Sequence, residues 1–420
     1  MLPAAKKYLD QYAEPLIHQT AAQRSECFAG APTAYTHVLV IPSYNESTAF
    51  VRRLTTQIFD SCKKLLVIVV INQPKERHRS STRLNQRLWD FCHSSLQGAS
   101  HKKGIYSLTT RSSKQCDFLC VDQFSEGISS KQGVGYARKL GCDIAVDLIA
   151  KGYLSENWLH CTDADATLPN DYFSAPSINK HYSALNYGFT HSFAKVHKSQ
   201  HQKTTEAASL LYESSIRYYC KGLTYAGSPY AFTTLGSAIA IQPNYYCLVR
   251  GFPKRAGGED FYLLNKLAKL APIFTMPQTI QLKPRASLRV PFGTGPAVCA
   301  LLKNNKLTDF NPWVFKHLKE WLEFSPKLHS HITDVSNSPL ASLSHATQQA
   351  LSDIKVQALL EHIGKQSKNS AQTERMIMDW FDGFKTLKFI HALTHNNYPK
   401  MGLAELQKNK SFNALFSNTL

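Results

Sequence analysis

The run LLVIVVI at residues 65–71 limits the possible folds of this chain more than any other feature. Seven consecutive apolar residues, most of them β-branched, are typical of a strand that is buried on both faces. The run is far shorter than the roughly 20 residues needed to span a bilayer. Because strands buried on both faces belong mostly to helix-covered parallel sheets, we expect an α/β domain.

Similar runs alternate with segments of helical periodicity along residues 35–280. HVLVIP at 37–42 is followed by apolar residues at helical spacing, before the run at 65–71. DFLCV at 117–121 comes before a long helical segment at 134–150, and WLHCT at 158–162 comes after it. This alternation predicts βα units that feed a mostly parallel sheet flanked by helices.

The length of 420 residues exceeds what one small core requires, so we expect more than one compact unit. The sheet pattern ends past Pro291, and segments such as NPWVFKHLKEWLEF show amphipathic helical spacing. We expect an N-terminal helical lead at 1–34, an α/β domain at 35–295 and a helical region at 296–420.

Charge and cysteine content indicate the surroundings of the protein. Lys and Arg number 48 against 30 Asp and Glu, a formal net charge of +18 that favours anionic partners. The ten cysteines form no CxxC pair, and the N-terminus lacks the pattern of a signal peptide. We therefore expect reduced thiols in a cytoplasmic protein that makes peripheral contact with an anionic membrane at most. The basic residues are not interleaved with aromatic ones as in RNA-binding signatures, so we do not expect nucleic acid as a partner.

The sequence DADA at 163–166 directly follows the expected strand at 158–162. The side chains of Asp163 and Asp165, two positions apart past a strand end, can converge on one hard cation. Mn²⁺ or Mg²⁺ in such a site typically also binds phosphate oxygens of a substrate. A solvated surface turn is the alternative interpretation, because two acids at this spacing are common.

Four motifs occur in one order along the chain: PSYNES at 42–47, GVGYARKLG at 133–141, DADA at 163–166 and GGED at 257–260. Their types and order resemble those of the family 2 glycosyltransferases. The resemblance covers residues 35–289 and implies a GT-A type, Rossmann-like sheet with a helical C-terminal extension. It also implies a nucleotide-sugar donor and Mn²⁺ or Mg²⁺ held by Asp163 and Asp165, with Asp163 also contacting the donor.

The first motif implies that Pro42, Tyr44 and Glu46 line the nucleotide pocket. A loop that caps the next helix is the alternative, in which Glu46 complements the helix dipole as a first-turn acid. Many family members end the second strand with an Asp that contacts the nucleoside. Here Asn72 stands at that place, and the resemblance implies it as the residue that contacts the nucleoside.

The segment at 133–141 resembles the family's G-x-x-x-ARN-x-G pattern, which implies that Arg138 lies near the nucleotide. Lys139 replaces the Asn of that pattern and inherits no role. An exposed arginine on a helix face is the alternative interpretation of Arg138. The basic, glycine-containing segment at 283–295 supplies Arg285 and Arg289 as residues that could close over phosphates, or that form an exposed basic loop.

The GGED segment resembles the motif that usually supplies the catalytic base of the family. It implies Asp260 as the group that takes the proton of the acceptor hydroxyl, with Glu259 orienting Asp260 or the acceptor. A pair of acids that cap the following helix is the alternative.

The resemblance therefore implies a metal-dependent, inverting transfer of one sugar to an acceptor of unknown kind: a glycan, a lipid-linked molecule or a small molecule. The family's QxxRW motif of processive members is missing, which favours a non-processive enzyme. A nucleotidyltransferase stays open, although the glycine-rich phosphate loop of such enzymes is absent. A catalytically degenerate protein that binds sugar nucleotides or anionic polymers also stays open.

Overall fold

The computed structural model of the protein describes residues 4–29, 35–76, 79–96, 98–111, 114–155, 158–174, 181–192, 199–287, 293–304, 307–333 and 339–408. The chain forms two compact units. Unit 1 comprises Met1–Gln202 and Thr234–Cys299, and unit 2 comprises Lys203–Thr233 and Ala300–Leu420.

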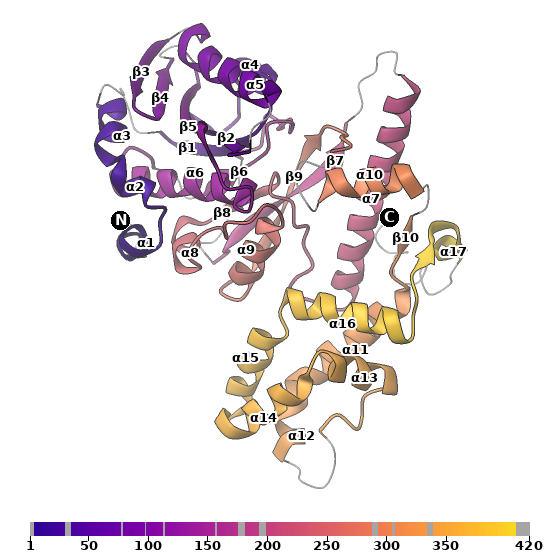
Figure 1. Ribbon diagram of the computed structural model, residues 1–420. Coiled ribbons are helices and arrows are strands. Elements are labelled where there is room, and N and C mark those ends of the chain that lie inside the picture. Colours follow the sequence, from indigo (N-terminus) through magenta and orange to yellow (C-terminus); the bar gives the residue numbers. More distant parts are fainter. Residues whose placement is uncertain are drawn as a thin grey trace. The chain divides into compact units, whose positions relative to one another are not determined.

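Unit 1 is built around a nine-stranded sheet with the strand order β3-β4-β5-β2-β1-β6-β8-β7-β9 (Figure 1). The strands are β1 (His37–Ser43), β2 (Leu65–Pro74), β3 (Ala99–Lys103), β4 (Tyr106–Thr110), β5 (Cys116–Ile128), β6 (Leu159–Cys161), β7 (Ala184–His191), β8 (Ile239–Ile241) and β9 (Ile273–Leu282). The four central strands β5, β2, β1 and β6 are parallel. The run at 65–71 is buried throughout in β2, which confirms the predicted α/β fold.

Helices cover both faces of the parallel strands. The connections from β1 to β2 and from β2 toward β5 run through α4 (Ala49–Thr56) and α5 (Arg79–Asp90), whereas α6 (Gly133–Ala150) leads back from β5 to β6. Because right-handed crossovers in opposite directions lie on opposite faces, α4 and α5 share one face and α6 lies on the other (Figure 1). The strands between them are therefore shielded from water on both sides.

An antiparallel hairpin of β3 and β4, absent from the expected elements, extends the sheet beyond β5. Its first strand reads ASHKK, a polar and partly exposed sequence without the apolar run on which the expectation was based. At the other side of the sheet, β8 is antiparallel to both β6 and β7. The sheet is thus mixed, with a parallel centre.

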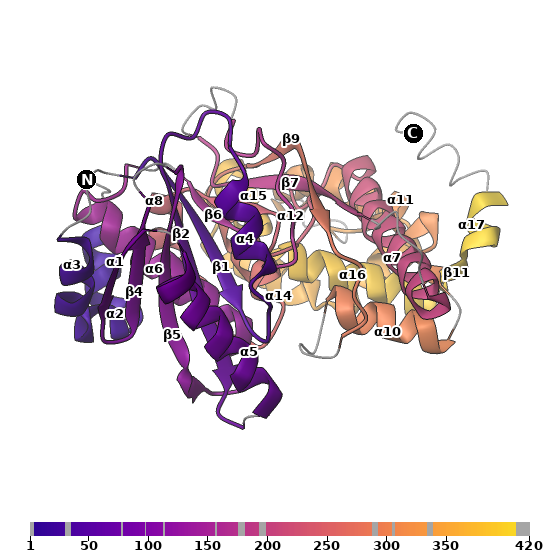
Figure 2. The same cartoon turned by 90° about the horizontal axis from the view of Figure 1, so that it is seen from above.

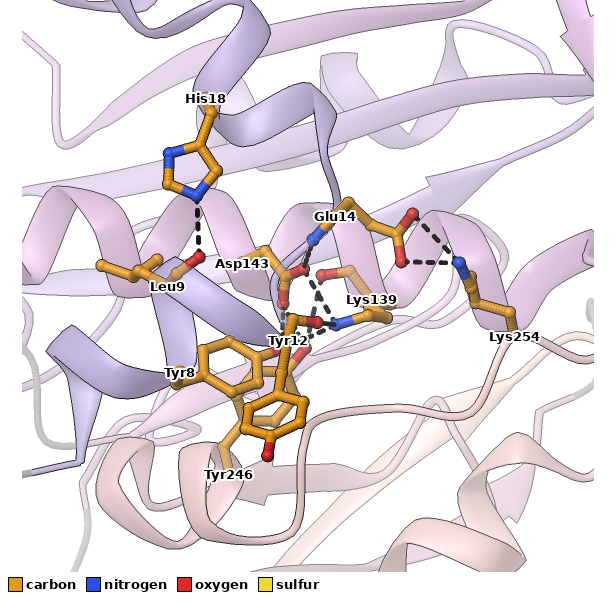
Figure 3. Close-up of polar contacts among 9 residues, drawn as sticks. All are labelled: Tyr8, Leu9, Tyr12, Glu14, His18, Lys139, Asp143, Tyr246 and Lys254. Atoms are coloured by element: carbon orange, nitrogen blue, oxygen red, sulfur yellow. Dashed lines mark hydrogen bonds and ion pairs between the residues drawn. The ribbon is translucent and has the colours of Figure 1, made fainter.

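The N-terminal helices α1 (Ala5–Gln11), α2 (Leu16–Gln19) and α3 (Ala21–Phe28) belong to unit 1, on the side of the sheet away from α4 and α5 (Figure 2). Helices α1 and α2 pack on α6, where a buried polar network joins them (Figure 3), and α3 packs on β3 and β4. Lys139 Nζ donates to Tyr8 Oη at 2.7 Å and pairs with Asp143 Oδ2 at 3.1 Å. Asp143 also accepts from Tyr8 Oη at 2.5 Å, from Tyr246 Oη at 2.8 Å and from the N–H of Glu14 at 2.8 Å. This network gives Lys139 a structural role.

Unit 2 is helical, as predicted for the C-terminal region. Its elements include α11 (Pro312–Phe324), α12 (Leu328–Thr333), α13 (His345–Asp353), α14 (Val356–Gln366), α15 (Ser370–Trp380), α16 (Gly383–Asn396), α17 (Leu403–Lys408) and the strand pair β10 (Thr308–Asp309) and β11 (Met401–Gly402). Trp321 and Phe389 are fully buried in its core.

The long helix α7 (Gln200–Tyr225) contributes Tyr218 and Leu223 to the core of unit 2, and α10 (Thr294–Asn304) crosses the boundary between the units. Residues 203–233 thus belong with the C-terminal helices, although the expected α/β range of 35–295 includes them. Among the described residues, no helix combines the length and the apolar character needed to cross a membrane.

Candidate functional site

Most of the sequence-predicted residues that the structure describes lie around the point where the strand order of unit 1 reverses. From β1 the chain continues to β2 and β5 on one side and returns through α6 to β6 on the other side. At such a switch point the loops beyond the carboxyl ends of the strands separate and leave a crevice in which ligands bind. Pro42 lies at the end of β1, and Asp163 follows two residues after β6.

The loop that carries Asp163 and Asp165 is held by its backbone. Arg53 on α4 donates to the carbonyl of Ala166 at 2.5 Å and to that of Ala164 at 3.4 Å. These bonds fix the loop without using either carboxylate. Arg53 was not among the predicted site residues, because its part depends on a contact more than 100 residues away in the chain.

Arg138 joins the aspartate loop to the GGED segment. Its guanidinium pairs with Asp163 Oδ1 at 2.5 Å and with Glu259 Oε1, and its side chain is 4% exposed. Burial tends to lower the pKa of Arg138, but Asp163 and Asp260 raise it above the ordinary value, so the guanidinium stays charged. A Cβ on Gly236 would lie 2.2 Å from Arg138 Nη1, so a glycine is required there for close approach.

Glu259 and Asp260 occupy the first turn of α9 (Glu259–Ala268), after Gly258 in the left-handed conformation at φ 72°. Asp260 Oδ1 accepts from the N–H of Phe261 at 2.7 Å. Burial raises the pKa of Asp260, while Arg138 and backbone N–H groups oppose the shift in part. A carboxylate with a raised pKa is a stronger proton acceptor, which suits the role implied for Asp260.

Arg285 lies after β9 and faces two carboxylates. Its guanidinium binds Glu46 in a bidentate pair at 2.8 and 3.3 Å, and Nη2 lies 3.8 Å from Asp165 Oδ2. An antiparallel bridge between Thr167 and Gln281 holds the end of β9 beside the aspartate loop. Glu46 precedes α4, which begins at Ala49, so it is not a first-turn acid of that helix.

Asp165 has a perturbed acidity. Burial and the neighbouring Asp163 raise the pKa of Asp165 to about 6, with Glu46 adding to the shift and Arg285 opposing it. Negative charges are therefore crowded around this carboxylate. Such crowding favours a cation, which would relieve the repulsion.

A second set of polar side chains lies between the loop after β1 and the end of β2. Asn85 on α5 accepts from the N–H of Asn45 at 3.0 Å and donates to the carbonyl of Asn72 at 3.3 Å. Asn45 itself has a positive φ of 57°. Asn72 and Asn85 are both buried, so these hydrogen bonds hold the end of β2 and the loop after β1 in fixed positions. Asn85 has no motif around it that could have marked it.

Several buried polar atoms at the site have no hydrogen-bond partner among the described residues: Ser43 Oγ, Asn45 Oδ1 and Arg138 Nε. Buried polar atoms are normally paired, so unpaired ones beside a crevice suggest a ligand or ordered water. Tyr44 is partly exposed beside them. Arg289 lies outside the described residues. Among the described residues, no group of three or more His, Cys, Asp and Glu side chains could hold a metal ion by itself.

Comparison with known proteins gave no match to a family model and none to a curated protein. Among solved structures, the chain is similar to the mannosyltransferase PcManGT from Pyrobaculum calidifontis, solved in complex with GDP-Man and Mn²⁺. The match covers 94% of this chain and 99% of that one, with 14% sequence identity and a TM-score of 0.34. A similarity at this level does not indicate what this chain binds.

Proposed function

We propose that this protein is a glycosyltransferase that moves a sugar from a nucleotide-diphosphate sugar to an acceptor, with a divalent metal held by Asp163 and Asp165. The observation that carries the proposal is the position of these two carboxylates at the switch point of the sheet, joined through Arg138 to Glu259, the neighbour of Asp260 on α9. The proposed metal ligands, the Arg138 link and the proposed proton acceptor all lie on elements of unit 1.

The donor atoms at the site fit a hard divalent cation. Asp163 and Asp165 offer carboxylate oxygens, and the raised pKa of Asp165 reflects crowded negative charge that a cation would offset. Two carboxylates leave room for phosphate oxygens and water, as Mg²⁺ and Mn²⁺ sites with nucleotide substrates do. When bound, the metal would stabilise negative charge that develops on the departing diphosphate.

The residues of the chain would then divide the remaining work. Asp260 takes the proton of the acceptor hydroxyl as its oxygen attacks the anomeric carbon, and the nucleoside diphosphate leaves on the opposite side, which inverts that carbon. Arg138, buried between Asp163 and Glu259, keeps the metal-binding loop in register with α9. We therefore assign Arg138 a positioning role rather than direct contact with the nucleotide.

The nucleoside end of the donor would occupy the crevice beside β1 and β2. The unpaired Ser43 Oγ and Asn45 Oδ1 are suitable partners for polar atoms of the base or ribose, beside Asn72 and Asn85. Pro42 and Tyr44 border the same strand end. The arrangement supports a nucleotide pocket in the place that the first motif implies.

Calorimetry with UDP and GDP, each with and without Mn²⁺, tests the proposal. We expect Mn²⁺ to tighten binding of at least one nucleotide about tenfold or more, equivalent to about 1.4 kcal/mol. Asp163→Asn and Asp165→Asn should each remove that gain, because a neutral amide is a poor ligand for a hard cation. If both variants retain the wild-type metal dependence, the metal site lies elsewhere.

A further inference from the structure

Arg285 and Arg138 both face the aspartate pair, but they are held differently. Arg138 is 4% exposed and is fixed from two sides by Asp163 and Glu259. Arg285 is 29% exposed and reaches its partners from the segment after β9. One guanidinium is therefore built into the core, and the other lies at the surface of the crevice.

The position of Arg285 places it in competition with a metal ion. It binds Glu46 in a bidentate pair and stands 3.8 Å from Asp165 Oδ2, one of the proposed metal ligands. A divalent cation at Asp165 would lie close to this guanidinium, and like charges a few ångströms apart repel strongly where water is partly excluded. Binding of the metal alone is thus opposed by a charge that already occupies the site.

A diphosphate changes this balance. Guanidinium groups bind phosphate oxygens bidentately, with strong charge-assisted hydrogen bonds. Arg285 could therefore exchange its partners on Glu46 and Asp165 for phosphate oxygens, which would leave Asp165 to the metal. The buried Arg138 cannot exchange its partners in the same way, because it is 4% exposed and ion-paired with both Asp163 and Glu259.

We propose that Arg285 makes metal binding conditional on a nucleoside diphosphate: it neutralises Glu46 and Asp165 when the crevice holds no phosphate, and turns to the phosphate when the donor enters. The inference rests on the proposed function, because it takes Asp165 as a metal ligand. It adds that metal and diphosphate bind cooperatively and that one arginine sets the size of the coupling.

The test measures binding of Mn²⁺ alone and then of Mn²⁺ with saturating UDP or GDP. Arg285→Gln should bind Mn²⁺ alone several-fold more tightly than wild type, since the competing charge is gone. Saturating nucleotide should tighten Mn²⁺ binding about tenfold in wild type but about threefold or less in Arg285→Gln. The difference corresponds to a loss of about 0.7 kcal/mol of coupling free energy between metal and nucleotide. A tighter metal site is not expected from a variant that is merely damaged.

Two further variants sharpen the result. Lys283→Gln removes one positive charge from an exposed side chain two residues away and controls for net charge; its affinity for Mn²⁺ alone should stay within about twofold of wild type. Arg285→Lys keeps the charge but loses the planar fork, so it should match wild type for Mn²⁺ alone and lose part of the coupling.

The outcomes separate this inference from the proposed function. If Arg285→Gln and wild type bind Mn²⁺ alone equally, or if Lys283→Gln tightens the site as much, the inference is wrong even where the metal-dependent nucleotide binding persists. If wild type shows no metal-dependent nucleotide binding at all, the proposed function is wrong. The affinity of Arg285→Gln for Mn²⁺ alone still decides whether Arg285 competes with a metal ion at Asp165.

Discussion

Glu259 and Asp260 are adjacent residues on the first turn of α9, yet their surroundings differ. Glu259 is 2% exposed and is paired with Arg138, so its carboxylate is already committed to a structural contact. Asp260 is partly exposed, and burial within the site raises its pKa. The difference favours Asp260 as the group that accepts the proton, with Glu259 as the residue that holds Arg138 in place.

Replacing Asp260 by Asn should separate binding from turnover. The amide keeps the shape of the side chain but cannot accept the acceptor's proton, so we expect turnover to fall about 10²- to 10⁴-fold. Donor affinity should stay within about twofold of wild type, because that carboxylate is not a proposed metal ligand. Calorimetry and a turnover assay on the same preparation supply the two numbers.

Glu259→Gln is the matched comparison at the neighbouring position. It should lower turnover less than Asp260→Asn and should lower the melting temperature, because it leaves the buried Arg138 with one charged partner fewer. Near-normal turnover in Asp260→Asn together with a large loss in Glu259→Gln would reverse the two roles. Activity in both variants would place the base on another residue.

The sequence predicted some of these residues and not others for a physical reason. Asp163, Asp165 and Asp260 stand in short motifs next to strand or helix ends, so local pattern was enough to single them out. Arg53 and Asn85 act through contacts with segments 111 and 40 residues away, and their own helices look ordinary. Only the folded chain brings these residues to the site.

At the scale of elements, α6 connects two different regions with two of its faces. Arg138 points to the aspartate loop and to α9. Lys139 and Asp143 contact the N-terminal segment (Figure 3), and Asp147, four residues further on, lies on the same stripe of the helix. Asp147 pairs there with the buried Arg24 at 2.8 Å. Because the two faces share one rigid helix, the N-terminal helices stabilise the element that presents Arg138.

The ion pair between Lys139 and Asp143 should be a major contributor to stability. Lys139→Met leaves a buried carboxylate with one charged partner fewer, and we expect the free energy of unfolding to fall by about 3–5 kcal/mol. Lys151→Met breaks an ion pair with the same four-residue spacing at the C-terminal end of the same helix, where Lys151 caps α6 and is 35% exposed. Its cost should be about 1 kcal/mol or less.

Urea unfolding of wild type and both variants gives the comparison. Equal losses in Lys139→Met and Lys151→Met would contradict the view that the N-terminal helices are locked onto α6 through this network.

Elements with strong patterns were predictable, and elements defined by their partners were not. Apolar runs such as the one at 65–71 predicted the parallel strands. The hairpin of β3 and β4 is polar on its outer strand and depends on pairing with β5, so its sequence resembles a loop. The long helix α7 was also absent from the expected elements, and it joins the core of unit 2 through Tyr218 and Leu223.

At the scale of the whole molecule, the candidate site draws all its described residues from unit 1. Unit 2 has a separate core in which α7 packs with C-terminal helices. Unit 1 ends at Cys299, near the expected boundary at residue 295. Residues 203–233, however, belong to unit 2, and the chain then re-enters unit 1 at Thr234. Sequence periodicity cannot show that a segment inside the α/β range belongs to the other unit, because periodicity indicates local structure and not which core a helix joins.

The central claim is transfer of a sugar with release of a nucleoside diphosphate. The most direct measurement is product analysis after incubation of the protein with Mn²⁺ and a panel of nucleotide-diphosphate sugars, in which water serves as a slow acceptor. We predict that at least one donor yields free sugar and nucleoside diphosphate, that Asp165→Asn abolishes the product, and that Asp260→Asn lowers it about 10²-fold or more. Release of pyrophosphate instead would indicate a nucleotidyltransferase, and binding of a donor without any turnover, even with candidate acceptors, would contradict the assignment as an enzyme.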